Sequence, residues 1–298
     1  MKKASLHPIL KKAKTLSAVT LKASLTCLVA AMLFSIKSLG QNHDEQKHYT
    51  CYRTDKPIHI DGKLTESAWK RAPWTDLFVD IEGSKKPLPL QNTRAKLVWD
   101  DTYLYIAAVM EEQHIWAYQS KKDQIVYLEN DFEVFIDPDG DSENYYELEI
   151  NAINNSFDLF LPKTYRNGGR ADLKWDIKDL KSAVSIEGTI NNPSDTDKQW
   201  TLEIAIPLES LSTKDVPAAI PHDGAIWRLN FSRVNWQHTV TENKYSRLRN
   251  AQTNKIIPEY NWVWSPQGKI NMHIPETWGY LHFSSGKPKK NRQKYTSK

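Results

Sequence analysis

Carboxylate and amide side chains recur along two segments near the middle of the chain, at the spacing of a β-strand. The segments read NDFEVFID and YYELEINA. In the second, the apolar side chains fall on one face, and Glu147, Glu149 and Asn151 fall on the other. In the first, Glu133 shares a partly apolar face with Phe135. A sheet that packs one face on a core and displays such groups on the other is suited to bind the hydroxyl groups of a sugar.

Aromatic side chains in predicted loops supply the other half of such a site. The apolar face of a sugar ring stacks on an aromatic ring, while neighbouring polar groups bond to the hydroxyls. We expect some of these loop residues to contact a ligand: Trp116, Tyr118, Tyr127, Trp175, Trp236 and Trp264. Four other tryptophans lie in phase with apolar neighbours and are predicted to be core: Trp69, Trp99, Trp200 and Trp227.

Arg233 is a further candidate, with two interpretations. It lies in phase with Phe231 on an apolar strand face. A buried arginine requires a charged partner, and Glu133 or Glu149 would serve. In one interpretation Arg233 forms a charge pair within the core. In the other, Glu133, Glu149, Asn151 and Arg233 surround one ligand pocket.

A short acidic loop between the two segments has the spacing of a metal site. Asp137, Asp139 and Asp141 alternate around Gly140. Hard oxygen ligands at this spacing suit a structural Ca²⁺, although the loop lacks the complete EF-hand pattern. The alternative is an aspartate-rich β-turn without an ion. No organic cofactor is expected.

Motifs typical of several enzyme classes are absent from the sequence. It contains no Gly-x-Ser-x-Gly, no His-Glu-x-x-His, no phosphate-binding glycine loop and no cysteine nucleophile near a histidine. A glycoside hydrolase is the alternative, because it needs only two acids placed roughly 5–10 Å apart across a sugar. Glu133 and Glu149, expected on neighbouring strands, would be that catalytic pair.

Short strand-like runs would position these residues. Turn residues rich in Asp, Asn and Gly separate the runs, and helical signal is confined to one turn each near 66–71 and 208–211. The pattern predicts an all-β protein, an antiparallel β-sandwich with one or two short helices. The predicted strands are 58–60, 95–99, 104–110, 132–136, 145–152, 157–161, 184–190, 200–206, 227–234 and 278–283.

Charge is distributed unevenly along the 298 residues. The formal net charge is +4, but residues 1–40 carry seven lysines and no acid, and residues 286–298 carry six basic residues and no acid. Residues 41–285 therefore have a net charge of −9, which argues against nucleic-acid binding. We expect this body to form one domain, and the basic tail at 286–298 to be disordered.

Residues 1–40 have the layout of a secretory signal peptide. Their lysines precede an apolar run of roughly a dozen residues, shorter than the ~20 that span a bilayer, and cleavage is expected before Gln41. We expect an exported protein, periplasmic, extracellular or on the cell surface, with no membrane span after cleavage; a retained anchor is the alternative. Only Cys51 would remain, so neither an intrachain disulfide nor a cysteine-rich zinc site is expected.

Four motifs, in order along the chain, resemble those of family 9 carbohydrate-binding modules. IDGKLTESAW resembles the family's opening IDG-x-x-x-E-x-x-W, and LVWDDTYLY resembles its LWDDxYLY hairpin. NDFEVFID resembles its D-x-x-E-I-F-I-D strand, and WGYL resembles its closing strand. The resemblance spans Ile58 to Phe283. It implies a jelly-roll-like sandwich with structural calcium that holds glycans between two tryptophan rings.

The resemblance assigns Glu133 to the family's ligand-bonding glutamate, with three departures nearby. Tyr127 stands where the family has its first ring tryptophan, and Glu149 stands where it has a sugar-binding arginine. Residues 271–273 (NMH) fall near the second tryptophan. The fold is therefore carried over, but the family's preference for reducing ends is not. We predict an exported, non-catalytic protein that binds a poly- or oligosaccharide and assists carbohydrate catabolism.

Haem binding is a minor alternative that follows from the same resemblance, because similar sandwiches bind haem through Met, His or Lys. Met110 and Met272 would be the axial ligands. The sequence has no Cys-x-x-Cys-His motif for covalent attachment.

Overall fold

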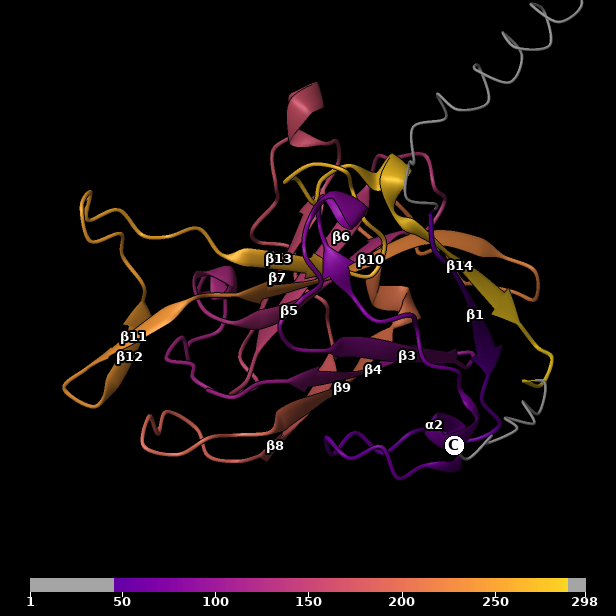
Figure 1. The fold of residues 1–298 in the computed structure, drawn as a ribbon. Coiled ribbons are helices and arrows are strands. Elements are labelled where there is room, and N and C mark those ends of the chain that lie inside the picture. Colours follow the sequence, from indigo (N-terminus) through magenta and orange to yellow (C-terminus); the bar gives the residue numbers. More distant parts are fainter. Residues whose placement is uncertain (1–45, 289–298) are drawn as a thin grey trace, which may run out of the picture. The chain divides into compact units, whose positions relative to one another are not determined.

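The computed structural model describes residues 46–288 as a protein built mainly from β-strands (Figure 1). The predicted signal peptide, residues 1–40, lies outside the described residues, as does most of the predicted tail at 286–298. No helix in the described part is both long enough and apolar enough to cross a membrane. Its helical segments are α2 (Ser67–Arg71) and the 3₁₀ turns η1 (Gly83–Lys85), η2 (Val126–Leu128), η3 (Tyr165–Asn167), η4 (Leu208–Ser210) and η5 (Pro275–Thr277).

One large sheet holds twelve strands, and β11 and β12 form a separate hairpin. The order across the large sheet is β7-β6-β5-β10-β14-β1-β3-β4-β9-β8, and β13 pairs with both β10 and β2. The strands are β1 (His48–Arg53), β2 (Val79–Asp80), β3 (Thr93–Trp99), β4 (Tyr103–Glu111), β5 (Asp131–Asp137), β6 (Tyr145–Asn151), β7 (Ser156–Leu161), β8 (Lys181–Glu187), β9 (Gln199–Pro207), β10 (Ile226–Asn235), β11 (His238–Thr241), β12 (Lys244–Arg247), β13 (Tyr260–Val263) and β14 (Gly279–Ser284).

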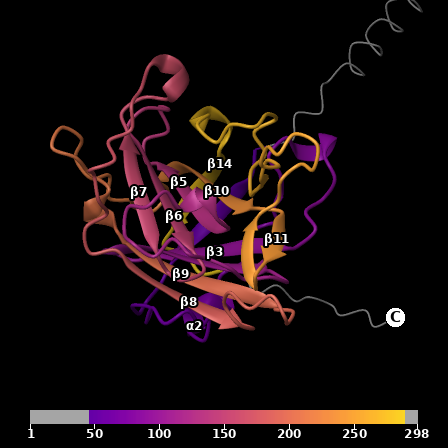
Figure 2. The ribbon, with the colours of Figure 1, turned by 90° about the vertical axis from the view of Figure 1, so that its left-hand side faces the viewer.

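The large sheet curls so that its two ends face each other across a core. In both views β5, β6 and β7 lie over the layer of β3, β9 and β8 (Figures 1 and 2). Inward side chains of both ends belong to one buried apolar cluster, which removes their surface from water. This arrangement confirms the predicted β-sandwich. The four tryptophans predicted as core are all buried: Trp69, Trp99, Trp200 and Trp227.

The sheet is mixed rather than antiparallel, which corrects one part of the prediction. β1 runs parallel to both β14 and β3 and thereby joins the two halves of the sandwich. Parallel strands have no connecting hairpin, so no local turn signal announces such a pairing. The predicted strand at 58–60 is not a strand, and five strands were not predicted: β1, β2, β11, β12 and β13.

The IDG motif, the first of the four that resemble family 9 modules, is held in place by one buried glutamate. Glu203 on β9 is fully buried, and its Oε2 accepts hydrogen bonds from the backbone N–H groups of Asp61 (2.9 Å) and Gly62 (2.8 Å). Its Oε1 accepts the indole N–H of Trp69 at 2.7 Å. Gly62 has φ +81°, and a Cβ there would lie 2.8 Å from the backbone of Ser185. One buried carboxylate thus fastens the IDG turn and α2 onto the sheet.

Candidate functional site

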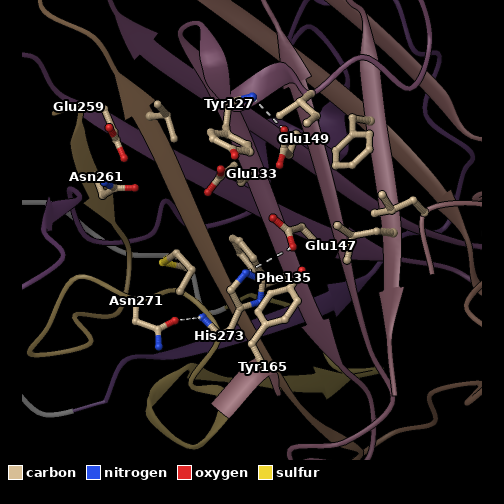
Figure 3. A pocket seen from close by; sticks show the side chains of 16 residues that line it. Tyr127, Glu133, Phe135, Glu147, Glu149, Tyr165, Glu259, Asn261, Asn271 and His273 are labelled. Carbon is tan, nitrogen blue, oxygen red and sulfur yellow. Dashed lines mark hydrogen bonds and ion pairs between the residues drawn. The ribbon is translucent and has the colours of Figure 1, made fainter. Parts of the chain in front are cut away.

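A cavity of about 420 Å³ lies against the face of the sheet that points away from the core (Figure 3). Side chains of β5, β6 and β7 form its floor, and residues of β10, β13 and the surrounding loops form its walls. Its lining consists of Ile125, Tyr127, Glu133, Phe135, Glu147, Glu149, Phe157, Leu159, Tyr165, Leu173, Val234, Glu259, Asn261, Asn271, Met272 and His273.

Strand alternation explains why the floor is acidic. Glu133 of β5 lies directly opposite Glu149 of β6 in the antiparallel register, and Glu147 lies two residues along the same face. One carboxylate oxygen from each of the three lies within 4.8 Å of the other two. All three side chains are buried, as is Asp131 at the end of β5. The alternate residues Phe132 and Val134, with their counterparts on β6, point into the core instead.

Burial and mutual repulsion oppose ionisation of these acids. Burial raises the pKa of Glu133 to about 7. Burial, followed by the charge of Glu133, raises the pKa of Glu149 to about 8. Burial, followed by the neighbouring Glu149 and Glu133, raises the pKa of Glu147 well above its usual value. A buried carboxylate loses its hydration, so the neutral form is favoured near neutral pH. The three groups titrate as a coupled cluster.

Tyr127 is held at the rim by its backbone, which leaves its ring free. Its N–H donates to Glu149 Oε2 at 2.9 Å, and its carbonyl accepts the indole N–H of Trp236 at 2.9 Å. The residue is 42% exposed. Figure 3 shows the ring beside Glu133 at the cavity. Tyr165 of η3, 48% exposed, lies at another part of the rim.

The wall formed by residues 271–273 carries neutral polar groups. Asn271 Oδ1 accepts the backbone N–H of His273 at 2.9 Å, and His273 Nδ1 lies 3.1 Å from the hydroxyl of Tyr145. Burial lowers the pKa of His273 to about 4, so its ring is neutral at pH 7. Its Nε2 is 3.9 Å from Glu147 Oε2, beyond hydrogen-bond distance. This segment, placed by the sequence near the family's second tryptophan, does reach the cavity.

Three of the eight predicted ligand residues line this cavity: Tyr127, Glu133 and Glu149. The expected convergence with Arg233 does not occur. Arg233 points to the core face of β10, where it is 1% exposed and donates to Glu112 at 2.8 Å and Thr93 at 2.9 Å. The charge-paired interpretation is therefore correct, but the partner is Glu112 and not either floor glutamate. The strand alternation of β10 was enough to predict that Arg233 is buried among apolar neighbours. Its partner was not predicted because Glu112 follows β4, far away in the sequence.

The other four predicted ligand residues also lie outside the cavity lining. Asn151 shares the face of Glu149 but is fully buried, and its side chain bonds to the backbone of Gln119, Ile153 and Asn155. The remaining three are aromatic residues engaged in packing. Trp175 packs on the core residues Tyr146 and Phe160, Trp236 stacks under Arg247, and Trp264 is buried beside Phe231.

Several lining residues were not predicted as ligand contacts. Glu147 carried the same alternation signal as Glu149 and was identifiable from it. Tyr165, Glu259 and Asn261 had no comparable signal, because loop paths and the unpredicted β13 bring them to the cavity. Of the two methionines considered for haem, Met110 is in the main core cluster and only Met272 lines the cavity.

The acidic loop after β5 brings the predicted calcium ligands together. Carboxylate oxygens of Asp137, Asp139 and Asp141 lie within 4.8 Å of one another. Asp137 is fully buried, and its oxygens accept the N–H groups of Gly140 and Ser142, both at 2.9 Å. Burial raises the pKa of Asp137 to about 7, which a cation would reverse. This hard-oxygen donor set fits Ca²⁺, while the same hydrogen bonds also satisfy an ion-free turn.

Comparison with known proteins agrees with this architecture. Residues 60–246, more than half of the chain, match the family described as carbohydrate family 9 binding domain-like. The chain belongs to this family. Both strands that carry the acidic floor of this family 9 protein, β5 with the motif NDFEVFID and the neighbouring β6, lie within the matched range.

Two curated relatives match about half of the chain. The chain is 28% identical over 156 residues to endo-1,4-beta-xylanase C of Paenibacillus barcinonensis, and 26% identical over 156 residues to exoglucanase XynX of Acetivibrio thermocellus. These alignments cover 52% and 51% of this chain but only 12% of each relative. The chain therefore corresponds to a small part of these longer proteins.

Solved structures share the fold at low sequence identity. A family 9 module from Caldicellulosiruptor kristjanssonii in complex with cellotriose aligns with TM-score 0.51 and 15% identity, over 80% of this chain and 95% of that one. A candidate carbohydrate-binding protein from Bacteroides uniformis aligns with TM-score 0.58 and 16% identity, over 80% of this chain and all of the other. At this identity the likeness establishes the fold alone.

Proposed function

We propose that this family 9 protein binds one or a few sugar units of a glycan in the cavity on the outer face of β5, β6 and β7, without chemical turnover. The observation that carries the proposal is one cavity in which exposed tyrosine rings at the rim meet buried carboxyl groups on the floor and more accessible amide groups on the walls. Rings cover the apolar face of a pyranose, and paired oxygens and amides bond to its hydroxyls.

The positions of the side chains around the cavity indicate which part of a sugar each would contact. Tyr127 and Tyr165 offer ring faces at the rim, and Glu133 and Glu149 offer hydrogen-bonding oxygens at the floor. Tyr127 holds its position through its backbone, so its ring is available for stacking. The cavity volume is within the range of small-molecule sites, which supports a mono- or disaccharide unit rather than a long buried chain.

Binding is better supported than hydrolysis by the placement of the acids. A glycosidase needs its two carboxyl groups on either side of the scissile bond. Glu133 and Glu149 are instead cross-strand neighbours that rise from the same floor, so they approach a bound sugar from one side. Activity on a panel of chromogenic glycosides, abolished in Glu133→Gln, is the result that would favour the hydrolase alternative.

The cellular setting is part of the proposal. The lysine-rich, apolar segment at 1–40 supports export, and the two relatives, a xylanase and an exoglucanase by name, support a connection with polysaccharide-degrading enzymes. We infer that the protein is exported to the periplasm, the cell surface or the medium, and assists carbohydrate catabolism by binding glycan. Structural Ca²⁺ at Asp137, Asp139 and Asp141 belongs to the same proposal.

Isothermal titration of the mature protein with neutral, acidic and amino mono- and oligosaccharides tests the proposal. Binding is expected for at least one sugar, and Tyr127→Ala should weaken it about tenfold because a stacked ring is lost. Leu90→Ala is the matched control, since Leu90 is 83% exposed and does not line the cavity. Absence of binding to every sugar, with and without Ca²⁺, overturns the proposal.

A further inference from the structure

In the described part of the chain, the lining of the cavity contains several acidic side chains and no basic partner for them. Four glutamates line it: Glu133, Glu147, Glu149 and Glu259. No lysine or arginine is among the described lining residues, and the lining histidine, His273, is neutral at pH 7 because burial lowers its pKa to about 4. A site for a neutral sugar needs no such excess of acids. Buried acids without a basic partner are uncommon unless they meet a cation or hold protons.

One of these acids also has an empty acceptor. Glu147 is 6% exposed, and its Oε2 is enclosed with no hydrogen-bond partner in the described structure. His273 Nε2 lies 3.9 Å from this oxygen. Figure 3 shows this carboxylate directed into the cavity between His273 and Glu149. An ionised carboxylate oxygen that is buried without a donor is costly, so ionisation of Glu147 is favoured when a ligand supplies a donor here.

The spacing of the acids matches a single primary ammonium group. The three carboxylate oxygens lie within 4.8 Å of one another. A point equally distant from three such oxygens is at most about 2.8 Å from each, which is within reach of charge-assisted N–H···O bonds. An ammonium group has three N–H donors, one for each glutamate. Ca²⁺ would need about twice as many oxygen ligands, roughly six to eight.

We propose that the preferred ligand is a sugar bearing a protonated primary amine, whose ammonium group is held by Glu133, Glu147 and Glu149 while its ring lies between the tyrosines of the rim. This inference rests on the proposed function and names its ligand class. The volume of about 420 Å³ and the aromatic rim exceed what a bare ion needs and suit a hexose ring. A free ion would leave most of that space to water.

Protons occupy the acids when the amine is absent, so binding is coupled to proton release. The charged or titratable groups that face the cluster in the described structure include Asp131, Glu259, His273, Tyr127, Tyr145 and Tyr165. None of these supplies a positive charge at pH 7. An arriving ammonium group favours the ionised carboxylates and expels protons that the burial of the cluster had retained.

The test compares ligands that differ only in the amine. Glucosamine and its β-1,4-linked disaccharide, N-acetylglucosamine and its disaccharide, and glucose and cellobiose are titrated calorimetrically at pH 7 in two buffers of different ionisation enthalpy. The amines are expected to bind at least tenfold more tightly than the acetylated or neutral sugars, with proton release. Glu147→Gln should remove this preference, and Glu209→Gln, at an exposed position outside the cavity, should retain it.

Three other outcomes would each overturn the inference, and the titrations distinguish them from one another. Neutral or acetylated sugars binding as tightly as the amines overturns the ligand class and leaves the proposed function intact. No binding of any sugar overturns both. CaCl₂ that binds alone, competes with glucosamine and loses its effect in Glu147→Gln identifies a metal site instead. If Glu147→Gln is not folded by circular dichroism, Glu133→Gln and the wild-type ligand comparison decide the matter.

Discussion

Replacing Glu133 by glutamine should make the protein more stable than the wild type above neutral pH. Glu133 is buried on the cavity floor opposite Glu149. Burial raises its pKa from 4.5 to about 7 in the folded protein. A carboxyl group with a raised folded pKa contributes stability below its unfolded pKa and loses that contribution as the pH rises through the folded value. Glutamine has the same shape and never ionises.

The magnitude follows from the two pKa values. Between pH 4.5 and 7 the folded wild type holds one proton at Glu133 that the unfolded chain has released. Each pH unit in this window is equivalent to about 1.4 kcal/mol, so the free energy of unfolding of Glu133→Gln should rise relative to wild type by about 3 kcal/mol. His273, whose pKa is lowered, acts in the opposite direction but is present in both proteins and cancels in the difference.

Denaturant unfolding at pH 4.5, 6, 7 and 8, followed by tryptophan fluorescence, measures this difference without ligand present. Glu209→Gln is the control, because Glu209 is exposed and its curve should run parallel to wild type. Parallel curves for Glu133→Gln and wild type, or a fall in the stability of the variant relative to wild type as pH rises, would show that Glu133 ionises normally in the fold. The account of the cavity as a cluster of neutralised acids would then be wrong.

Three further predictions concern the scaffold. Arg233→Met should lower the free energy of unfolding by about 3–5 kcal/mol because Glu112 loses its buried partner, and adding Glu112→Gln should restore at least half of it in denaturant titrations. Glu203→Gln should cost about 1–3 kcal/mol in the same assay, since an amide nitrogen cannot accept the N–H groups that this carboxylate binds; an unchanged stability would contradict the fastening role. Ca²⁺ should raise the melting temperature over that in EGTA, and Asp139→Asn should reduce this shift; equal melting temperatures in both conditions would argue for the ion-free turn.

Several site features could be predicted because they depend on local backbone geometry. Successive side chains of a strand point to opposite faces, so the letters of β5 and β6 alone placed Glu133 and Glu149 on one side and their apolar neighbours on the other. The same rule put Arg233 on the apolar face of β10. The spacing around Gly140 likewise predicted an acidic turn whose carboxylates converge.

Other features depend on which remote segments come together. The parallel pairing of β1 with β14 and β3 brings together the first and last strands of the described residues, and no local pattern encodes it. Glu112 reaches Arg233 only because β3 and β4 fold over β10 in the curled sheet. Trp264 reads as a loop residue but is buried, because its position on the path after β13 brings it against Phe231.

From the sequence alone came the β-strand alternation, the acidic face and the likeness to family 9 modules, since these are written in residues close together along the chain. Only the tertiary structure decided that the acidic face is partly covered and forms a cavity, and that Tyr165 and His273 share it. Loop paths and strand pairing set those contacts. They depend on the apolar surface that many segments bury together, which cannot be read from any one segment.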